Sequence, residues 1–187
     1  MIPEENTLAG KFLIAMPGLQ DSNFERSVVF VCAHSAEGAL GLVINQPHSA
    51  SMEEVIEQLS LPWHRSDKHI VYQGGPVSPE RGFILHEQML DIPGSLEVAP
   101  DIYMATNPEV LHFLAQSEET GRFLFSLGYA GWATGQLELE LRQNAWLIGQ
   151  TDPRIVFDLP ANDRWQAAIR AMGIDPALLV DAGGTAN

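Results

Sequence analysis

Three side chains at the ends of short apolar runs could take part in acid–base or nucleophilic chemistry. Cys32 and His34 stand two residues apart at the end of one run, and His86 ends the run Phe83-Ile84-Leu85. Histidine titrates near neutral pH, so His34 or His86 could act as a general acid or base on a small anionic metabolite. An exposed loop or capping role for each histidine is the simpler interpretation of the sequence.

A structural role is favoured for Cys32 over a role as a reactive thiol. The neighbours of Cys32 are apolar, which predicts a buried thiol with little thiolate character. A single cysteine cannot form an intramolecular disulfide, and neither His-x-x-x-His nor His-Glu-x-x-His occurs in the chain. The sequence therefore predicts no metal site and no cofactor.

A second group of residues could bind a ligand without reacting with it. Arg26 could bind a carboxylate or phosphate group, or it could form a structural ion pair with Asp21 or Glu25. The turn Gly74-Gly75-Pro76 could present backbone N–H groups to an anion, but no phosphate-binding fingerprint accompanies it. A tight turn before the proline is the competing interpretation.

Aromatic and amide side chains follow further along the chain. Tyr129, Trp132 and Gln136 cluster among glycines, where they could form the floor of a pocket or pack a turn against the core. Polar groups at strand ends are expected to meet at the margin of a sheet, where binding sites are commonly built. The predicted ligand-binding residues, which would share one pocket, are Arg26, His34, Asn45, Gly74, Gly75, Tyr129, Trp132 and Gln136.

Short strands must position most of these side chains. Apolar runs bounded by turn residues predict strands at Lys11–Met16, Ser27–Ala33, Leu40–Asn45, His69–Gln73, Gly82–His86, Ile102–Ala105, Arg122–Leu127, Ala145–Ile148 and Ile155–Phe157. Both faces of Ser27–Ala33 are apolar, which predicts a central strand covered on both sides.

Capping signals predict the helices. Ser51-Met52-Glu53-Glu54 has the pattern of a capping box, and Asn107-Pro108 supplies an N-cap followed by a proline at the first helical position. Gln136–Arg142 alternates like a strand but consists of strong helix formers, so we predict a helix with Thr134 available as its N-cap. The other predicted helices run from Ser51 to before Pro62, from Asn107 to before Gly121, over about Asn162–Met172 and from Asp175 through Val180.

The order of these elements favours an α+β fold. Strands follow one another at hairpin-like spacings, and strand-helix-strand alternations are few. We therefore expect a mixed, largely antiparallel, curled sheet flanked by helices. The terminal segment, residues 181–187, is rich in small residues and is predicted to fray.

The composition limits the class of protein. A chain of 187 residues can form one full hydrophobic core, so residues 1–187 are predicted to be a single domain. The formal net charge of −14 opposes binding to nucleic-acid phosphates. No apolar stretch is long enough to cross a bilayer, and the first residues lack the pattern of a secretory signal, so we expect a cytoplasmic protein.

Several motifs extend from about residue 8 to residue 173. They are Leu8-Ala9-Gly10-Lys11-Phe12-Leu13-Ile14-Ala15-Met16-Pro17, Arg26-Ser27-Val28-Val29, Gly41-Leu42-Val43-Ile44-Asn45, Gly74-Gly75-Pro76-Val77, Gly128-Tyr129-Ala130-Gly131-Trp132, Gly135-Gln136-Leu137-Glu138 and Asn144-Ala145-Trp146-Leu147. In content and order they resemble the AlgH/YqgE family of bacterial proteins. The resemblance implies a single α+β domain with a curled, barrel-like mixed sheet, and it places Cys32 and His34 at the family's Cys-x-His pattern. It implies no catalytic residue, because the family is largely uncharacterised.

Three functions remain open at this point. The first is a regulatory or small-ligand-binding protein, in which an acidic face could also dock a protein partner. The second is an enzyme that acts on a small anionic metabolite through His34 or His86. The third is a DNA-binding transcriptional regulator, because some members of the AlgH/YqgE family, which the chain resembles, carry that label. The net charge of −14 disfavours this function.

Overall fold

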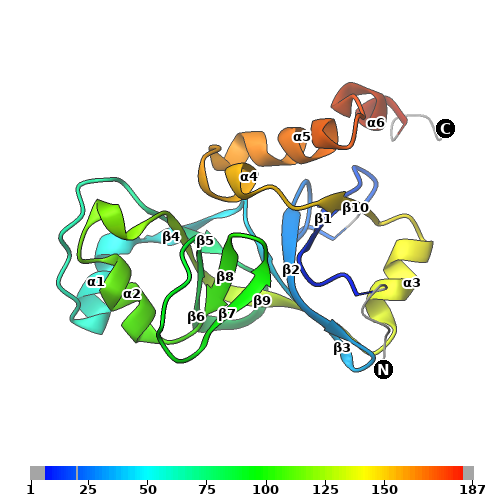
Figure 1. The fold of residues 1–187 in the computed structure, drawn as a ribbon. Coiled ribbons are helices and arrows are strands. Elements are labelled where there is room, and N and C mark those ends of the chain that lie inside the picture. Colours follow the sequence, from blue (N-terminus) through cyan, green and yellow to red (C-terminus); the bar gives the residue numbers. More distant parts are fainter. Residues whose placement is uncertain (1–6, 20, 183–187) are drawn as a thin grey trace.

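The computed structural model describes residues 7–19 and 21–182, and its centre is one curled sheet (Figure 1). The strands run in the spatial order β10-β1-β2-β3-β9-β6-β8-β7, while β4 pairs with β5 and β5 joins the sheet through β9. The pairing of β5 with β9 is parallel, and the other pairings between described strands are antiparallel. The strands are β1 (Lys11–Ala15), β2 (Val28–Ser35), β3 (Gly38–Val43), β4 (Pro47–Ser51), β5 (Ile70–Gln73), β6 (Val77–His86), β7 (Ser95–Ala99), β8 (Ile102–Ala105), β9 (Phe123–Ala133) and β10 (Trp146–Gln150).

Helices flank this sheet on three sides. In Figure 1, α1 and α2 lie at one end of the molecule, α3 lies at the other end, and α4 to α6 run along one side between them. Their bounds are α1 (Met52–Leu59), α2 (Pro108–Leu114), the 3-10 turn η2 (Glu118–Thr120), α3 (Gln136–Arg142), α4 (Pro153–Phe157), α5 (Ala161–Ala171) and α6 (Pro176–Ala182). The predicted α+β class with a curled, mixed, largely antiparallel sheet is confirmed. None of the helices in the described ranges is long and apolar enough to span a bilayer.

The long strand β9 joins the two halves of the sheet. Its first part pairs with β5 and β6, and its second part pairs with β3. Between them the strand bends at Gly128, whose φ of 74° is a left-handed conformation that only glycine adopts easily. At this bend the chain after β5 crosses so closely that a Cβ on Gly75 would lie 2.1 Å from the carbonyl carbon of Tyr129.

The hydrophobic core lies in three clusters, one under each group of helices. One contains Trp165 and Ile169 of α5, a second contains Val55 of α1 with residues of α2, and the third contains Leu137 of α3. Strand β2 contributes to the first and third clusters with alternate side chains, such as Phe30 and Val29. This confirms that β2 is a central strand covered on both faces.

The local capping signals were accurate. Ser51 and Glu54 form the capping box of α1 with reciprocal bonds, and Asn107 accepts from the backbone N–H of Glu109 at the start of α2. The ambiguous segment 136–142 is helical, but its N-cap is Gly135. Thr134 instead donates its hydroxyl to the Glu37 carbonyl oxygen at 3.1 Å.

Some predictions of secondary structure were wrong. The segment Ile155–Phe157 is part of α4, because Asp152 caps the backbone N–H of Arg154 and Pro153 occupies the first helical position. Strands β4 and β7 were missed, since neither has a continuous apolar run. Helix α6 extends through Ala182 of the segment predicted to fray, and residues 183–187 lie outside the described chain.

Candidate functional site

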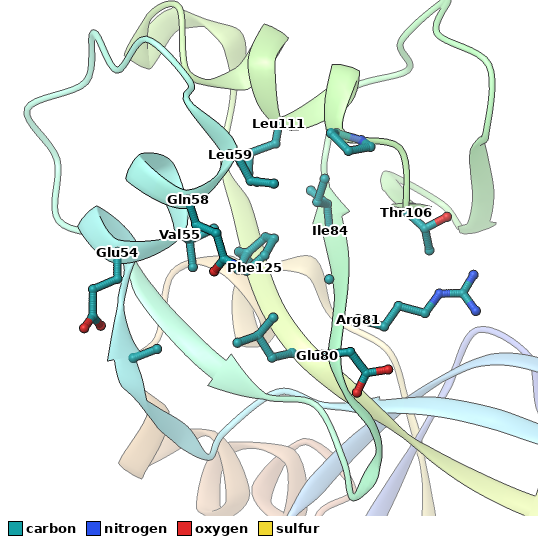
Figure 2. A pocket seen from close by; sticks show the side chains of 14 residues that line it. Glu54, Val55, Gln58, Leu59, Glu80, Arg81, Ile84, Thr106, Leu111 and Phe125 are labelled. Atoms are coloured by element: carbon teal, nitrogen blue, oxygen red, sulfur yellow. The ribbon is translucent and has the colours of Figure 1, made fainter.

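An apolar pocket of about 480 Å³ lies between helices α1 and α2 and strands β6 and β9 (Figure 2). This volume falls within the range of sites that enclose small organic ligands. The apolar side chains that line it are Ala50, Val55, Leu59, Ile84, Pro108, Leu111, Phe125 and Leu127.

The local sequence explains how these side chains come to face one space. Val55 and Leu59 are four residues apart on α1, so both lie on the same helix face. Gly82 lies beside the ring of Phe125, and a Cβ there would come within 3.0 Å of a ring carbon. The absence of a side chain at Gly82 therefore leaves room for the aromatic floor of the pocket.

Polar groups are confined to the rim of the pocket. They belong to Glu54, Gln58, Glu80, Arg81 and Thr106, which Figure 2 shows around the apolar floor. One carboxylate oxygen of Glu54 already accepts the backbone N–H of Ser51 at 2.7 Å. The described residues that line the pocket include no Cys, Ser or His, and they offer an apolar volume with a few polar contacts at its edge.

His34 lies at a different place, beside an open hollow of about 530 Å³ that Tyr129 and Trp132 also line. Its Nδ1 accepts the backbone N–H of Leu8 at 3.0 Å, so the proton of the neutral ring must lie on Nε2. Nε2 then donates to Glu138 at 2.9 Å, and this bond is the largest cause that lowers the pKa of the Glu138 carboxyl. Both nitrogens of His34 are occupied, and only 3% of its side chain is exposed.

The remaining aromatic and amide candidates serve the packing of α3 against the sheet. Trp132 donates its indole N–H to Glu140 at 2.9 Å, and Trp146 donates to the same carboxylate oxygen at 2.8 Å. Gln136 accepts the backbone N–H of Ala133 and donates to the other oxygen of Glu140. These contacts hold Trp132 and Gln136 in place through the protein itself.

Arg26 and Asn45 lie apart from this hollow. The guanidinium of Arg26 stacks over the Trp165 ring at 5.6 Å and lines a separate pocket with α5 and α6 residues. Asn45 accepts the backbone N–H of Val28 at 2.8 Å and donates to the Arg26 carbonyl at 2.9 Å. Asn45 therefore fixes the entry of the chain into β2.

Gly74 and Gly75 form a close backbone crossing. A Cβ on Gly74 would lie 2.3 Å from the Gly128 carbonyl oxygen, and Gly75 lies equally close to the backbone around Tyr129. The structure thus places His34, Tyr129 and Trp132 around one hollow but does not bring all eight predicted residues into one pocket. The expectation of a single shared pocket is corrected. Gly74 and Gly75 form a chain crossing and Asn45 fixes the entry into β2, while Arg26 lines another pocket and Gln136 binds Ala133 and Glu140.

The second candidate histidine and the cysteine are both buried. His86 is 0% exposed, donates from Nδ1 to the Gln88 carbonyl oxygen at 2.8 Å and lies 2.9 Å from the Ser95 hydroxyl through Nε2. Burial lowers the pKa of His86. Burial also raises the pKa of the Cys32 thiol, whose Sγ contacts the Phe30 carbonyl oxygen.

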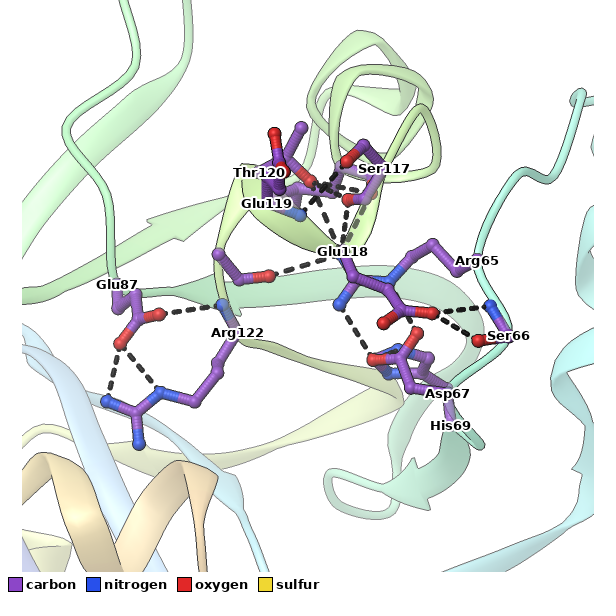
Figure 3. A network of polar contacts seen from close by, with 12 residues as sticks. Arg65, Ser66, Asp67, His69, Glu87, Ser117, Glu118, Glu119, Thr120 and Arg122 are labelled. Atoms are coloured by element: carbon purple, nitrogen blue, oxygen red, sulfur yellow. Dashed lines mark hydrogen bonds and ion pairs between the residues drawn. The ribbon is translucent and has the colours of Figure 1, made fainter.

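A polar network that sequence reasoning missed anchors the loop before β5 (Figure 3). The buried Arg65 binds Asp67 through Nε at 2.9 Å and Nη2 at 2.7 Å. Its Nη1 lies 3.0 to 3.3 Å from four oxygens around η2, including the carbonyl oxygens of Leu114 and Gly121. The ring of His69 stacks on Phe123 at 4.2 Å and also binds Asp67.

This network predicts an acid-sensitive contribution to stability. The hydrogen bond from Arg65 is the main cause that lowers the pKa of Asp67 to about 2. A carboxyl with a lowered pKa stabilises the fold above its ordinary pKa, and this stabilisation fades as the pH falls from about 4 toward 2. The Asp67 side chain is 39% exposed, so screening limits the contribution to about 1 kcal/mol.

Asp67→Asn should therefore lower the free energy of unfolding at pH 6 by about 1 kcal/mol and have little effect near pH 2. Urea denaturation at the two pH values measures the difference. Asp91→Asn, at an exposed position, is the control and should change neither value. An equal loss at both pH values would show that the charge of Asp67 does not account for its effect.

Comparison with known proteins gives a consistent picture. A family model described as AlgH-like matches residues 12–177. A UPF0301 protein from Magnetococcus marinus is 55% identical over 182 residues, which are 97% of this chain and 98% of that protein. The solution structure of the AlgH protein from Pseudomonas aeruginosa covers all of both chains with 42% identity and a TM-score of 0.78. A crystal structure from Corynebacterium diphtheriae, at 20% identity and a TM-score of 0.71, shares the fold over 98% of this chain and 95% of that one.

Proposed function

The chain belongs to the AlgH-like family, and from that premise we propose that it is a small-ligand-binding protein whose site is the pocket between α1 and α2. The names of its relatives state no reaction, so the proposal rests on the geometry of the pocket. The ligand is a compact molecule with a mainly apolar body and a polar end that reaches the rim. Binding, with no chemical step, is the activity proposed.

One observation carries this proposal. The pocket has an apolar floor built from two helices and two strands, and its polar groups are restricted to the rim. Burial of apolar ligand surface supplies affinity at about 25 cal/mol per Å², while rim groups such as the Gln58 amide set the orientation of the ligand. Leu59 remains 41% exposed at the pocket although it is apolar, and a bound ligand would cover it.

The arrangement of the histidines supports a binding role over an enzymatic one. A general acid or base must reach the substrate with a free nitrogen or an exchangeable proton. Both nitrogens of His34 bind protein groups, and the ring of His86 is fully buried. Neither histidine lines the proposed pocket.

Titration with N-phenyl-1-naphthylamine, a neutral apolar fluorophore, tests the proposal. We expect saturable fluorescence enhancement with one site per chain. Leu59→Lys should weaken this binding about tenfold. The ligand loses its contact with an apolar side chain, and such a contact contributes about 1.5 kcal/mol to the binding free energy. A lysine at the last turn of α1 is compatible with the helix dipole, so folding should be preserved.

Leu139→Lys provides a matched control. Leu139 is 48% exposed on α3, at the opposite end of the molecule, and the same substitution there should leave binding unchanged (Figure 1). Weak, non-saturable enhancement in the wild type would contradict the proposal. Equal losses in the two variants would show that the probe responds to general surface change and not to the pocket.

A further inference from the structure

Another pocket, of about 310 Å³, lies between the start of β5, the start of β9 and the connection from α4 to α5. Its walls include apolar residues such as Phe123, Val156 and Leu159. It contains three cationic side chains, namely Lys68, Arg122 and Arg164, whereas Arg81 is the one Lys or Arg that lines the pocket between α1 and α2. This concentration of positive charge stands out in a chain with a net charge of −14.

Arg164 places a positive charge at the buried end of this pocket. The residue is 4% exposed, and its guanidinium binds only neutral acceptors. Nε donates to the Leu159 carbonyl oxygen at 2.9 Å, Nη1 donates to the Ile44 carbonyl oxygen, and Nη2 donates to the Tyr72 hydroxyl oxygen at 3.0 Å. Among the described residues no carboxylate lies within ion-pair distance of Arg164. A buried arginine normally has an anionic partner, and this one lacks it within the described chain.

Both carboxylates of this pocket are already paired with cations other than Arg164 and Lys68. Asp67 is held by Arg65 in a two-point contact and by His69. Asp158 pairs with Arg122, which also binds Glu87 through Nε at 2.8 Å (Figure 3 shows the contacts of Arg122 with Glu87). Lys68 is exposed and forms no ion pair among the described residues. The charges of Arg164 and Lys68 therefore remain uncompensated.

Tyr72 adds a hydrogen-bond donor beside the buried charge. Its hydroxyl oxygen accepts from Arg164, which leaves the hydroxyl hydrogen to point elsewhere. Tyr72 is 6% exposed and lines the same pocket. A guanidinium with two N–H groups beyond those already used and an adjacent phenol form a donor set suited to the oxygens of an anion.

We propose that this pocket binds a small oxyanion, the phosphate or carboxylate group of a compact metabolite, with Arg164 and Tyr72 at its buried end and Lys68 at its mouth. The apolar walls contact the rest of the metabolite. The inference is independent of the pocket between α1 and α2, because the two sites share no lining residue.

Inorganic phosphate and malonate, titrated separately at constant ionic strength with chloride as the balancing anion, test the proposal. The backbone amide resonances of residues 66–73 and 158–165 should shift saturably in ¹H–¹⁵N spectra with at least one of the two anions. A response to phosphate alone identifies the phosphate group as the ligand chemistry, and a response to malonate alone identifies the carboxylate.

Two variants locate the site. Lys68→Ala removes an exposed cation without ion pairs and should weaken binding about threefold to tenfold, while Tyr72→Phe removes one buried donor and should weaken it by a similar factor. The chain has one other lysine, so Lys11→Ala is the matched control and should bind like the wild type. Absence of a saturable shift with both anions would overturn the proposal. So would unchanged affinity in both Lys68→Ala and Tyr72→Phe.

Discussion

Gly75→Ala is expected to lower the free energy of unfolding by about 3–4 kcal/mol, or to prevent folding altogether. A methyl group on this residue would lie 2.1 Å from the carbonyl carbon of Tyr129 and 2.2 Å from the backbone nitrogen of Ala130. Both atoms belong to the main chain of β9, so neither can move aside by a side-chain rotation. The two halves of the sheet would have to separate where β9 bends.

Urea denaturation of Gly75→Ala beside Gly18→Ala measures this effect. Gly18 has no heavy atom within 4 Å of the position of an added Cβ, so its variant should differ from the wild type by less than about 0.5 kcal/mol. A loss below about 1 kcal/mol for Gly75→Ala would show that the crossing can relax. The outcome also distinguishes the two interpretations of the turn Gly74-Gly75-Pro76, a ligand-binding turn and a purely structural one. In a ligand-binding turn the methyl group would impair ligand binding but would leave the free energy of unfolding of the free protein unchanged.

Arg65→Met should lower the free energy of unfolding by about 3–5 kcal/mol. The guanidinium is buried and links the loop before β5 to the carbonyl groups around η2, and it holds Asp67 (Figure 3). Methionine fills part of the volume but donates no hydrogen bond. Several carbonyl oxygens and one carboxylate then each lose a donor at once.

Arg154→Met is a closely matched control for this experiment. Arg154 also binds an aspartate two residues away, Asp152, with 2.7 Å between Nη2 and Oδ2. Its side chain is 79% exposed, so this ion pair should contribute less than about 1 kcal/mol. Thermal or urea denaturation of both variants compares the two pairs directly. Similar losses in the two variants would mean that burial of Arg65 and its carbonyl contacts add nothing to stability.

The secondary structure followed local chemistry wherever that chemistry was unambiguous. The capping box of α1 and the Asn107-Pro108 start of α2 formed as predicted, because the bonds that satisfy the first backbone N–H groups of a helix come from nearby residues. Prediction was wrong at Ile155–Phe157, where three apolar residues resemble a strand. Asp152 and Pro153 carried the correct signal, a capped helix start.

The candidate site was only partly accessible from sequence. His34, Tyr129 and Trp132 do lie around one hollow. The rule that residues at strand ends form a binding site also included Asn45 and the glycines, but these residues contact the protein backbone. The pocket between α1 and α2 was missed because its lining consists of apolar side chains at helical or strand spacing. In sequence alone such residues cannot be distinguished from ordinary core residues.

The sequence by itself determined the α+β class, the capped helices, the central apolar strand and the burial of Cys32, since each depends on residue type and short-range spacing. Only the tertiary structure decided which side chains of the strand ends and helices meet. Arg164 contacts Tyr72 across 92 positions and Ile44 across 120, and both contacts depend on how α5 crosses the curled sheet. Such long-range contacts depend on how the whole core packs, and no local sequence pattern encodes that packing. For this reason the sequence could indicate which side chains are chemically capable, but only the tertiary structure shows which of them lie together.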